Sequence, residues 1–164
     1  MEQGTGNKVT IRVAAEGDAA AVARLLTELN EAVGADGVPP GEDRRPENVI
    51  VTTEKSRQRL GASVDVEVTL LAKLDGAAVG LVAVRIVPYL GQDVPFAEVT
   101  QLYVAPAQRR RGVGTALLLA AEELARSRGC TSVHVIAARG NADALALYPE
   151  AGYEPLYVGF EKFL

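Results

Sequence analysis

Apolar residues alternate with polar ones, or form short unbroken runs, in five stretches of the chain, and both patterns are typical of β-strands. The five stretches are residues 9–14, 66–74, 77–90, 96–104 and 131–138. Asp75 and Gly76 separate the second stretch from the third and favour a hairpin turn. We therefore predict an antiparallel meander over residues 66–104, and one or two closing strands within residues 153–164.

Helical periodicity fills much of the first half of the chain between these strands. One face of residues 16–34 carries apolar side chains at Val22, Leu25, Leu26, Leu29 and Val33. Asp18 is a candidate N-cap for this helix, and Gly34 is a candidate C-terminal stop. Pro46 suits the first turn of a second helix over residues 46–61.

The clearest helix follows three consecutive arginines. Its apolar stripe consists of Leu117, Leu118, Ala121, Leu124 and Ala125. Gly129 should end it, and Asn141 and Pro149 should begin and end a shorter helix over residues 141–148. The order of elements is strand, two helices, three strands, helix, strand, helix and strand, which predicts a mixed α/β (α+β) fold. Residues 97–138 should form a right-handed parallel crossover.

Length and composition fit one globular domain. The 164 residues are 48% hydrophobic and 23% charged, enough for one core and too few for two ordinary domains. We expect residues 1–8 to form a flexible tail and residues 9–164 a single domain. Nothing approaches the roughly 20 consecutive apolar residues of a membrane span, so we expect no membrane association.

Charge and cysteine content narrow the function. The single cysteine, Cys130, excludes a disulfide within the chain, favours the cytoplasm, and leaves no ligand set for a metal. A net charge of −4 argues against non-specific nucleic-acid binding. Arg109, Arg110 and Arg111 nevertheless adjoin one another, and a local basic cluster in an acidic chain favours a small anionic ligand.

Residues 109–115, RRRGVGT, lie where a strand-like segment turns into the clearest helix. A helix N-terminus offers unpaired N–H groups and a partial positive charge, which together suit a phosphate. Gly112 and Gly114 would let a phosphate approach the backbone, and the arginines add charge. We interpret the segment as a pyrophosphate cradle. It lacks the lysine of a P-loop and the third glycine of a dinucleotide fingerprint. The alternative is that the arginines solvate the helix start and the glycines only form the turn.

The same segment resembles the Q/R-x-x-G-x-G/A signature of the GNAT superfamily of N-acetyltransferases. A second stretch fits the family pattern N-x-x-A-x-x-x-Y-x-x-x-G-F at Asn141, Ala144, Tyr148 and Gly152, with Tyr153 in place of Phe. The resemblance covers residues 96–155, and two motifs at family spacing are more specific than either alone. It implies the family's largely antiparallel sheet, with a central, splayed parallel strand pair and flanking helices.

The resemblance also implies acetyl-CoA as co-substrate, and which residues bind it. The pyrophosphate would lie against Arg109, Arg110, Arg111, Gly112, Val113, Gly114 and Thr115. The pantetheine arm would follow Leu102, Tyr103 and Val104 in the gap between the splayed strands, with the Leu102 N–H polarising the thioester carbonyl. Asn141 would contact pantetheine through its side chain.

Two catalytic roles are implied in the same way. Tyr148 matches the family's general acid, and an oriented phenol can give its proton to a leaving thiolate. Glu98, in the sequence FAEV, matches the glutamate base of histone-type members and would take a proton from the acceptor amine. The alternatives are a Tyr148 ring packed in the core and a Glu98 side chain that faces solvent.

The implied activity is transfer of an acetyl group from acetyl-CoA to a primary amine by direct attack. Residues 35–46 mix both signs of charge and do not identify the acceptor, and a small molecule is slightly favoured because no extra domain could recognise a protein. A covalent route through Cys130 is not expected, since no polarising group lies near it in sequence. His134 should be structural, and a homodimer is compatible with the family. The alternative function is an acyl-CoA-binding module with little or no catalysis.

Overall fold

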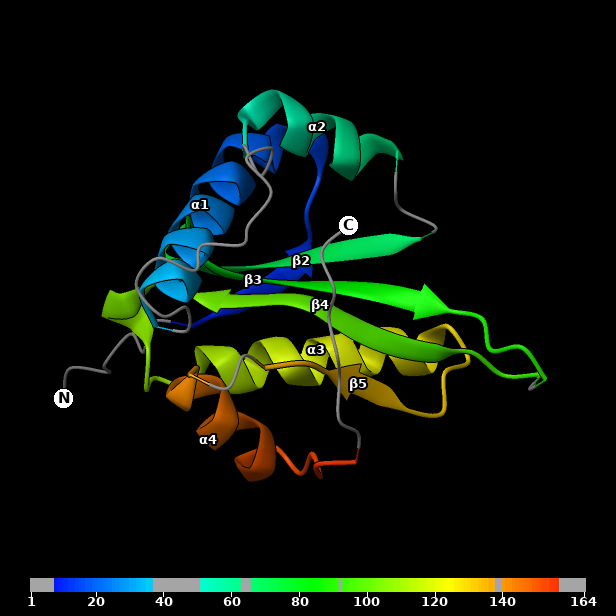
Figure 1. Ribbon diagram of the computed structural model, residues 1–164. Helices are drawn as coiled ribbons and strands as arrows, with labels where there is room; N and C mark the ends of the chain where they lie inside the picture. The colour runs from blue at the N-terminus through cyan, green and yellow to red at the C-terminus, as the bar shows by residue number, and fades with distance from the viewer. Residues whose placement is uncertain (1–7, 37–50, 63–65, 92, 138–139, 157–164) are drawn as a thin grey trace, which may run out of the picture.

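The computed structural model describes residues 8–36, 51–62, 66–91, 93–137 and 140–156, and all statements about structure below concern these residues (Figure 1). The strands are β1 (Thr10–Val13), β2 (Glu67–Leu74), β3 (Ala77–Val87), β4 (Phe96–Val104) and β5 (Val133–Val135). The α-helices are α1 (Ala19–Asp36), α2 (Thr53–Ala62), α3 (Val113–Ser127) and α4 (Ala142–Glu150). Two 3₁₀ turns, η1 (Glu16–Asp18) and η2 (Pro106–Gln108), precede α1 and α3.

The strands form one five-stranded sheet in the order β1-β2-β3-β4-β5. The first four strands pair antiparallel, whereas β4 and β5 pair parallel through the α3 crossover. The antiparallel meander over residues 66–104 and the parallel crossover are therefore confirmed.

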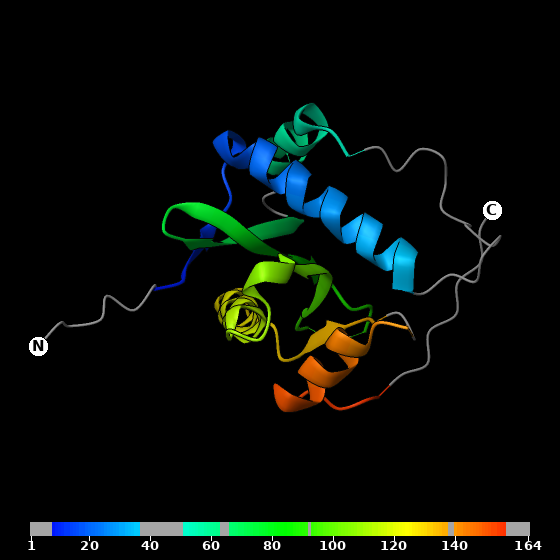
Figure 2. The ribbon, with the colours of Figure 1, turned by 90° about the vertical axis from the view of Figure 1, so that its left-hand side faces the viewer.

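Helices cover both faces of this sheet (Figures 1 and 2). α1 and α2 lie on one face, and α3 and α4 lie on the other. On the α1 face, Leu25 packs in one buried cluster with Leu71, Leu81 and Tyr103. On the α3 face, the buried side chains are those of Val68, Leu70, Ala72, Val79, Val82, Val84, Ala97, Val99, Val113, Leu117, Leu118, Ala121 and Ala125. The alternation in β2 and β3 thus supplies a separate core to each helical layer.

β4 and β5 stay together for only a short distance. Their parallel pairing joins Ala97–Val99 to Val133–Val135, and β4 then continues to Val104 without a partner on that edge among the described residues. The register with β3 shifts at the same point, because Ala83 opposes Gln101 while Val84 opposes Val99. Thr100 is therefore the extra residue of a β-bulge, and bulges bend a strand and increase its twist. The predicted splay of the parallel pair is confirmed.

Glycine at position 80 permits β3 to lie close to its neighbours. A Cβ atom there would stand 2.8 Å from the Tyr103 carbonyl oxygen and 3.1 Å from Cδ1 of Leu117. Any larger residue would push β3 away from both β4 and α3.

No helix within the described residues is long and apolar enough to cross a membrane.

Several predicted boundaries are wrong. Gly34 does not end the first helix, since α1 continues to Asp36. Helix α2 begins at Thr53, and Val51 and Thr52 before it are not helical, while Pro46 lies outside the described residues. The Thr52 hydroxyl accepts a hydrogen bond from the Lys55 N–H at 3.1 Å. The strand expected over 131–138 is limited to β5. Residues 153–156 are not a strand, while 157–164 and most of the predicted tail lie outside the described residues.

Asp18 does not cap α1 in the predicted way, because its carboxylate connects β1, η1 and β2. Both oxygens accept hydrogen bonds from Arg12 at 2.7 Å, and one accepts from the Ala15 N–H at 2.9 Å. Lys73 Nζ lies 3.3 Å away, and the Asp18 side chain is only 11% exposed. Hydrogen bonds from Arg12, followed by that from Ala15, hold the pKa of Asp18 well below its usual range.

We expect Asp18→Asn to lower the free energy of unfolding by about 2 kcal/mol at neutral pH, because the Arg12 and Lys73 charges lose their partner. A carboxyl whose pKa is lower in the folded state stabilises fully above its unfolded pKa of about 3.9 and loses this effect as the pH falls. The gap between the wild type and the variant should therefore shrink in urea titrations below about pH 4.

Asp75→Asn is the matched control. Asp75 is an exposed residue of the β2–β3 turn with φ of 49°, a conformation that asparagine also adopts. Its substitution should change stability by less than about 0.5 kcal/mol. An equal loss in both variants would show that the Asp18 network contributes nothing specific.

Candidate functional site

The start of α3 has the backbone shape of an anion-binding turn. Gly112 precedes the helix with φ of 78°, and Arg110 has φ of 58°, so two residues of this turn are left-handed. The Ala116 N–H donates to the Gly112 carbonyl at 2.9 Å, and the amides of Val113 to Thr115 precede that bond. Amides in the first turn of a helix have no acceptor in the helix and are available to an anion.

The three arginines have different surroundings. Arg109 donates through Nε to the Val104 carbonyl at 3.0 Å and through Nη1 to Asp143 at 3.3 Å. Arg110 also pairs with Asp143, at 3.6 Å, and is well exposed. Arg111 donates to Gln108 at 2.8 Å. Asp143 therefore offsets part of the positive charge of Arg109 and Arg110.

A cleft of about 570 Å³ begins at this turn and runs between β4 and α4. Figure 2 looks onto the end of the molecule where α3 begins, with the last turns of α1 and the first turn of α4 at the same end. The cleft is lined by ten of the residues predicted from the sequence: Leu102, Tyr103, Val104, Arg109, Arg110, Gly112, Gly114, Thr115, Asn141 and Tyr148. The two motifs, more than 25 residues apart along the chain, thus meet at one cavity.

Three predicted residues do not line this cleft. Val113 is 2% exposed and packs in the core beneath α3. Arg111 is exposed and turns to Gln108. Glu98 is also absent from the cleft lining. Arg85 donates two hydrogen bonds to its carboxylate, at 2.6 and 3.2 Å.

Asn141 has a structural role that its sequence position predicted. Its side-chain oxygen accepts from the Ala144 N–H at 3.0 Å and so caps α4. The Nδ2 amide is the remaining polar group of this side chain at the cleft wall. Capping therefore fixes the orientation in which Asn141 lines the cleft.

Tyr148 lies on α4 and is partly buried against the core of the α3 face. Burial raises the pKa of its phenol, so the hydroxyl keeps its proton throughout the ordinary pH range and is a weaker acid than free tyrosine. Its ring centroid is 6.0 Å from that of Tyr153. Tyr148 is therefore a partly buried, protonated hydrogen-bond donor in the wall of the cleft.

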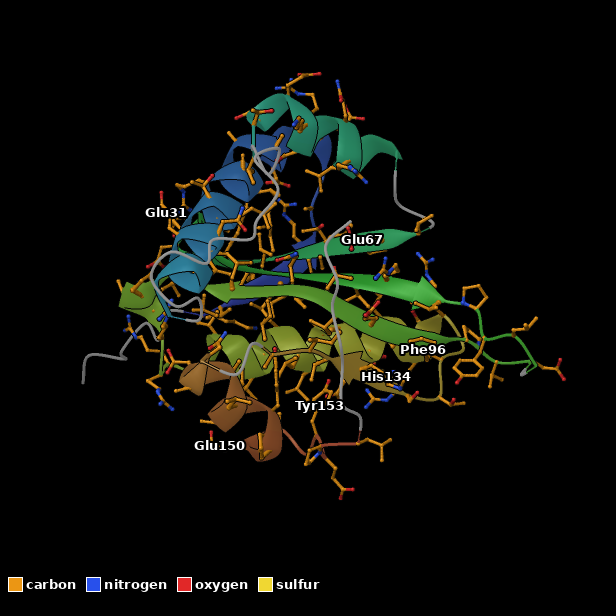
Figure 3. The ribbon with its side chains drawn as sticks, viewed as in Figure 1. Glu31, Glu67, Phe96, His134, Glu150 and Tyr153 are labelled. Carbon is orange, nitrogen blue, oxygen red and sulfur yellow. The ribbon has the colours of Figure 1, made fainter. Side chains whose placement is uncertain are left out.

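Tyr153, which replaces the phenylalanine of the family pattern, connects the end of α4 to α3 (Figure 3). Its hydroxyl donates to Glu122 at 3.2 Å, and Arg126 donates to the other carboxylate oxygen of Glu122 at 3.0 Å. Burial first, and then the charge of Glu122, raise the pKa of Tyr153 strongly. This bond holds the ring next to Tyr148 in place.

Cys130 and His134 lie outside the cleft lining. Cys130 packs against the core of the α3 face, and burial raises the pKa of its thiol, which lowers its reactivity. His134 on β5 stacks on Phe96 with ring centroids 4.5 Å apart, and its Nε2 lies 3.4 Å from the Ser132 hydroxyl (Figure 3). Both residues therefore have packing partners, in agreement with the prediction for His134.

Some lining residues were not predicted from the sequence. Leu29 and Ala32 come from α1, and Asp143 and Leu147 come from α4. No motif marks the two α1 residues, since their apolar periodicity is that of any core-facing helix. Asp143 lies within the second motif, and its negative charge was the one sequence signal that this motif could form ion pairs with the arginines.

Comparison with known proteins identifies the family. Residues 37–153 match the family model of the acetyltransferase (GNAT) family. The chain therefore belongs to this family of acyltransferases, which use acetyl-CoA, and the predicted resemblance is confirmed.

One relative is the aminoglycoside N(6')-acetyltransferase type 1 of Klebsiella aerogenes, 39% identical over 83 residues. That stretch is 48% of this chain and 53% of the relative, so the match spans about half of the relative's length.

Solved structures agree with the fold. A ribosomal-protein-alanine N-acetyltransferase from Brucella melitensis biovar Abortus 2308 has a TM-score of 0.77 at 20% identity, over 96% of this chain and 99% of that one. An aminoglycoside N-acetyltransferase in complex with CoA has a TM-score of 0.75 at 20% identity, over 99% of each chain. At such identities the likeness concerns the fold alone.

We expect Tyr153→Phe to lower the free energy of unfolding by about 1–2 kcal/mol, because Glu122 loses a hydrogen bond at a partly buried position. Urea unfolding of Tyr153→Phe, Glu122→Gln and the double variant would give the coupling between the two residues.

Tyr89→Phe is the matched control, since Tyr89 is about half exposed and contacts Phe96 through its ring. Additive effects of the Tyr153 and Glu122 substitutions would contradict the bond.

Proposed function

We propose that this protein is an N-acetyltransferase that moves the acetyl group of acetyl-CoA to a primary amine by direct attack. One observation carries the proposal. The first turn of α3, the unpaired edge of β4, and the side chains of Asn141 and Tyr148 all line a single cleft. Such a cleft offers successive groups for a diphosphate, an extended amide-containing arm and a leaving sulfur.

The diphosphate would bind at the first turn of α3. A Cβ placed on Gly112 would meet no atom within 4 Å, so the space in front of this glycine is open. The amides of Val113 to Thr115 would donate to phosphate oxygens, and Arg109 and Arg110 would supply charge. Asp143 would keep both arginines at the rim of the cleft.

The pantetheine arm would take the place that β5 leaves open beside β4. Beyond Val99 this edge has no strand partner among the described residues, and Leu102, Tyr103 and Val104 line the cleft. Backbone groups of a strand edge are strong hydrogen-bonding groups and readily pair with an extended ligand. In this position the Leu102 N–H would polarise the thioester carbonyl.

The transfer step then involves one bond made and one bond broken. The acceptor nitrogen attacks the thioester carbonyl carbon, a C–N bond forms, and the C–S bond breaks. The attacking amine loses one proton, and the CoA thiolate takes one from Tyr148. The partly buried Tyr148 phenol holds its proton until negative charge develops on the sulfur.

Glu98 has a narrower role in this scheme. Its neighbours Ala97 and Val99 pack on the α3 face, so the Glu98 side chain lies on the α1 face of β4, bonded to Arg85. We propose that the proton of the amine reaches Glu98 through water rather than by direct contact.

A simple assay tests the proposed function. Incubation with acetyl-CoA and a panel of amines should release free thiol, and mass spectrometry should find the acetylated amine. Thermal stabilisation by CoA without thiol release from any amine would instead favour an acyl-CoA-binding module.

We expect Gly112→Val to weaken CoA binding by about tenfold or more, because the side chain would occupy the space proposed for the diphosphate. Isothermal titration calorimetry with CoA measures this change. Gly129→Val is the matched control, because Gly129 has φ of 76° at the opposite end of the same helix and also has open space around it. Equal CoA affinities in the two variants would contradict this binding site.

We expect Tyr148→Phe to lower kcat by about 100-fold or more while the affinity for CoA stays within about twofold, since only the proton donor is lost. Pre-steady-state thiol release and calorimetry separate the two effects. Equal losses in kcat and affinity would show that Tyr148 acts by packing alone.

A further inference from the structure

A second cavity, of about 300 Å³, lies on the other face of the sheet, beneath α1 and α2. Its walls are formed by Val13, Ala14, Val22, Leu26, Asn30, Val51, Lys55, Ser56, Arg59, Leu60, Glu67, Val68, Thr69, Leu81, Ala83 and Gln101. This volume is at the lower end of the range for small-molecule sites. None of these residues lines the cleft proposed for acetyl-CoA.

The two cavities lie on either side of the same two elements. On β4, Gln101 lines this second cavity and Leu102 lines the cleft. On α1, Asn30 lines the second cavity and Leu29 lines the cleft. Consecutive side chains of a strand point to opposite faces, so a molecule in the second cavity would have to reach the thioester past the unpaired edge of β4 beyond Val99.

The charges of this cavity are divided between its two sides. Lys55 and Arg59 lie one turn apart on α2, and neither forms an ion pair or hydrogen bond through its side chain with any described residue. Glu67 lies on the sheet side and accepts a hydrogen bond from the Thr100 hydroxyl at 2.5 Å. Figure 3 shows Glu67 on β2, in the sheet that α2 covers. The cavity therefore has a cationic wall and an anionic wall.

Ser56 adds a donor to the cationic wall. It is the one buried polar residue among the described residues, with 5% exposure, and it lines the cavity between Lys55 and Arg59. Its backbone N–H donates to the Thr52 carbonyl at 2.9 Å, which fixes Ser56 in the first turn of α2. A serine hydroxyl in a cavity wall can donate a hydrogen bond to an acid group, so Ser56 places a neutral donor beside the two cations.

Given the acetyltransferase function proposed above, we propose that the acceptor is a small amine that also carries an acid group, such as an amino acid, and that it binds in this second cavity. Lys55, Arg59 and Ser56 hold the acid group. The amine lies toward Glu67 and Gln101, on the side of β4 from which the thioester is reached. A polycationic acceptor, such as an aminoglycoside or a polyamine, would meet two unpaired cations at α2 and is disfavoured.

Matched amine pairs test this proposal. Each amino acid is compared with the amine that lacks its carboxylate, for example phenylalanine with phenethylamine and alanine with ethylamine. Thiol release from acetyl-CoA gives kcat/KM, and calorimetry in the presence of CoA gives binding of the same compounds. Loss of the α-carboxylate should lower kcat/KM by about tenfold or more. Spermidine and sisomicin serve as polycationic arms.

Variants of α2 locate the acid-binding group. Arg59→Gln should raise KM for the amino acid about tenfold and leave KM for acetyl-CoA unchanged, because the acid group loses one charged donor. Arg57→Gln is the matched control on the same helix, since Arg57 pairs with Glu54 and does not line the cavity. Arg59→Glu should lower kcat/KM for amino acids further and raise it for spermidine.

The outcomes separate this proposal from the function on which it rests. Thiol release that is faster with spermidine or sisomicin than with every amino acid would overturn the acceptor class while supporting the acetyltransferase. Equal effects of Arg57→Gln and Arg59→Gln would also overturn it. Amino-acid binding that Arg59→Gln abolishes, without thiol release, would support the cavity and contradict the transfer. Absence of both binding and turnover for all amino acids would overturn the proposal outright.

Discussion

The separation of β4 from β5 after Val99 is the constraint on which the site depends. A strand edge inside a folded domain carries backbone N–H and C=O groups that must find partners. Here β3 satisfies one edge of β4 throughout, but β5 satisfies the other edge only as far as Val99. The cleft exists because this half-paired strand meets the uncapped start of α3. A ligand with an extended amide-containing arm and a phosphate would therefore pair with the open edge of β4 and with the free amides at the start of α3.

The two cavities divide the chemistry between them. On the α3 face, the helix start, two arginines and a buried phenol suit an anionic donor molecule, and Asp143 limits the excess positive charge. On the α1 face, the cavity has cations on the helix side and a carboxylate on the sheet side. β4 is the wall common to both. The amine and the thioester would therefore approach from opposite sides of one strand, and neither would have to pass the other.

The sequence predicted those features of the structure that depend on residues close together in the chain. The order of the elements, the hairpin at Asp75, the Asn141 cap and the turn before α3 each depend on residues close together in the chain. The boundary at Gly34 failed because a single glycine costs a helix only about 1 kcal/mol, and α1 continues past it.

Contacts between distant segments were not predictable in this way. Arg109 and Asp143 are 34 positions apart, and the cavity beside Ser56 needs α2 and β2 together. The face of Glu98 was ambiguous because the bulge at Thr100 breaks the period-two pattern of β4.

The single residue inserted at this bulge, Thr100, has a wider consequence. It bends the strand where the sheet opens, so the width of the opening is set within the β3–β4 hairpin itself. Substitutions in α1 and α2 would therefore reshape the second cavity and leave this opening as it is.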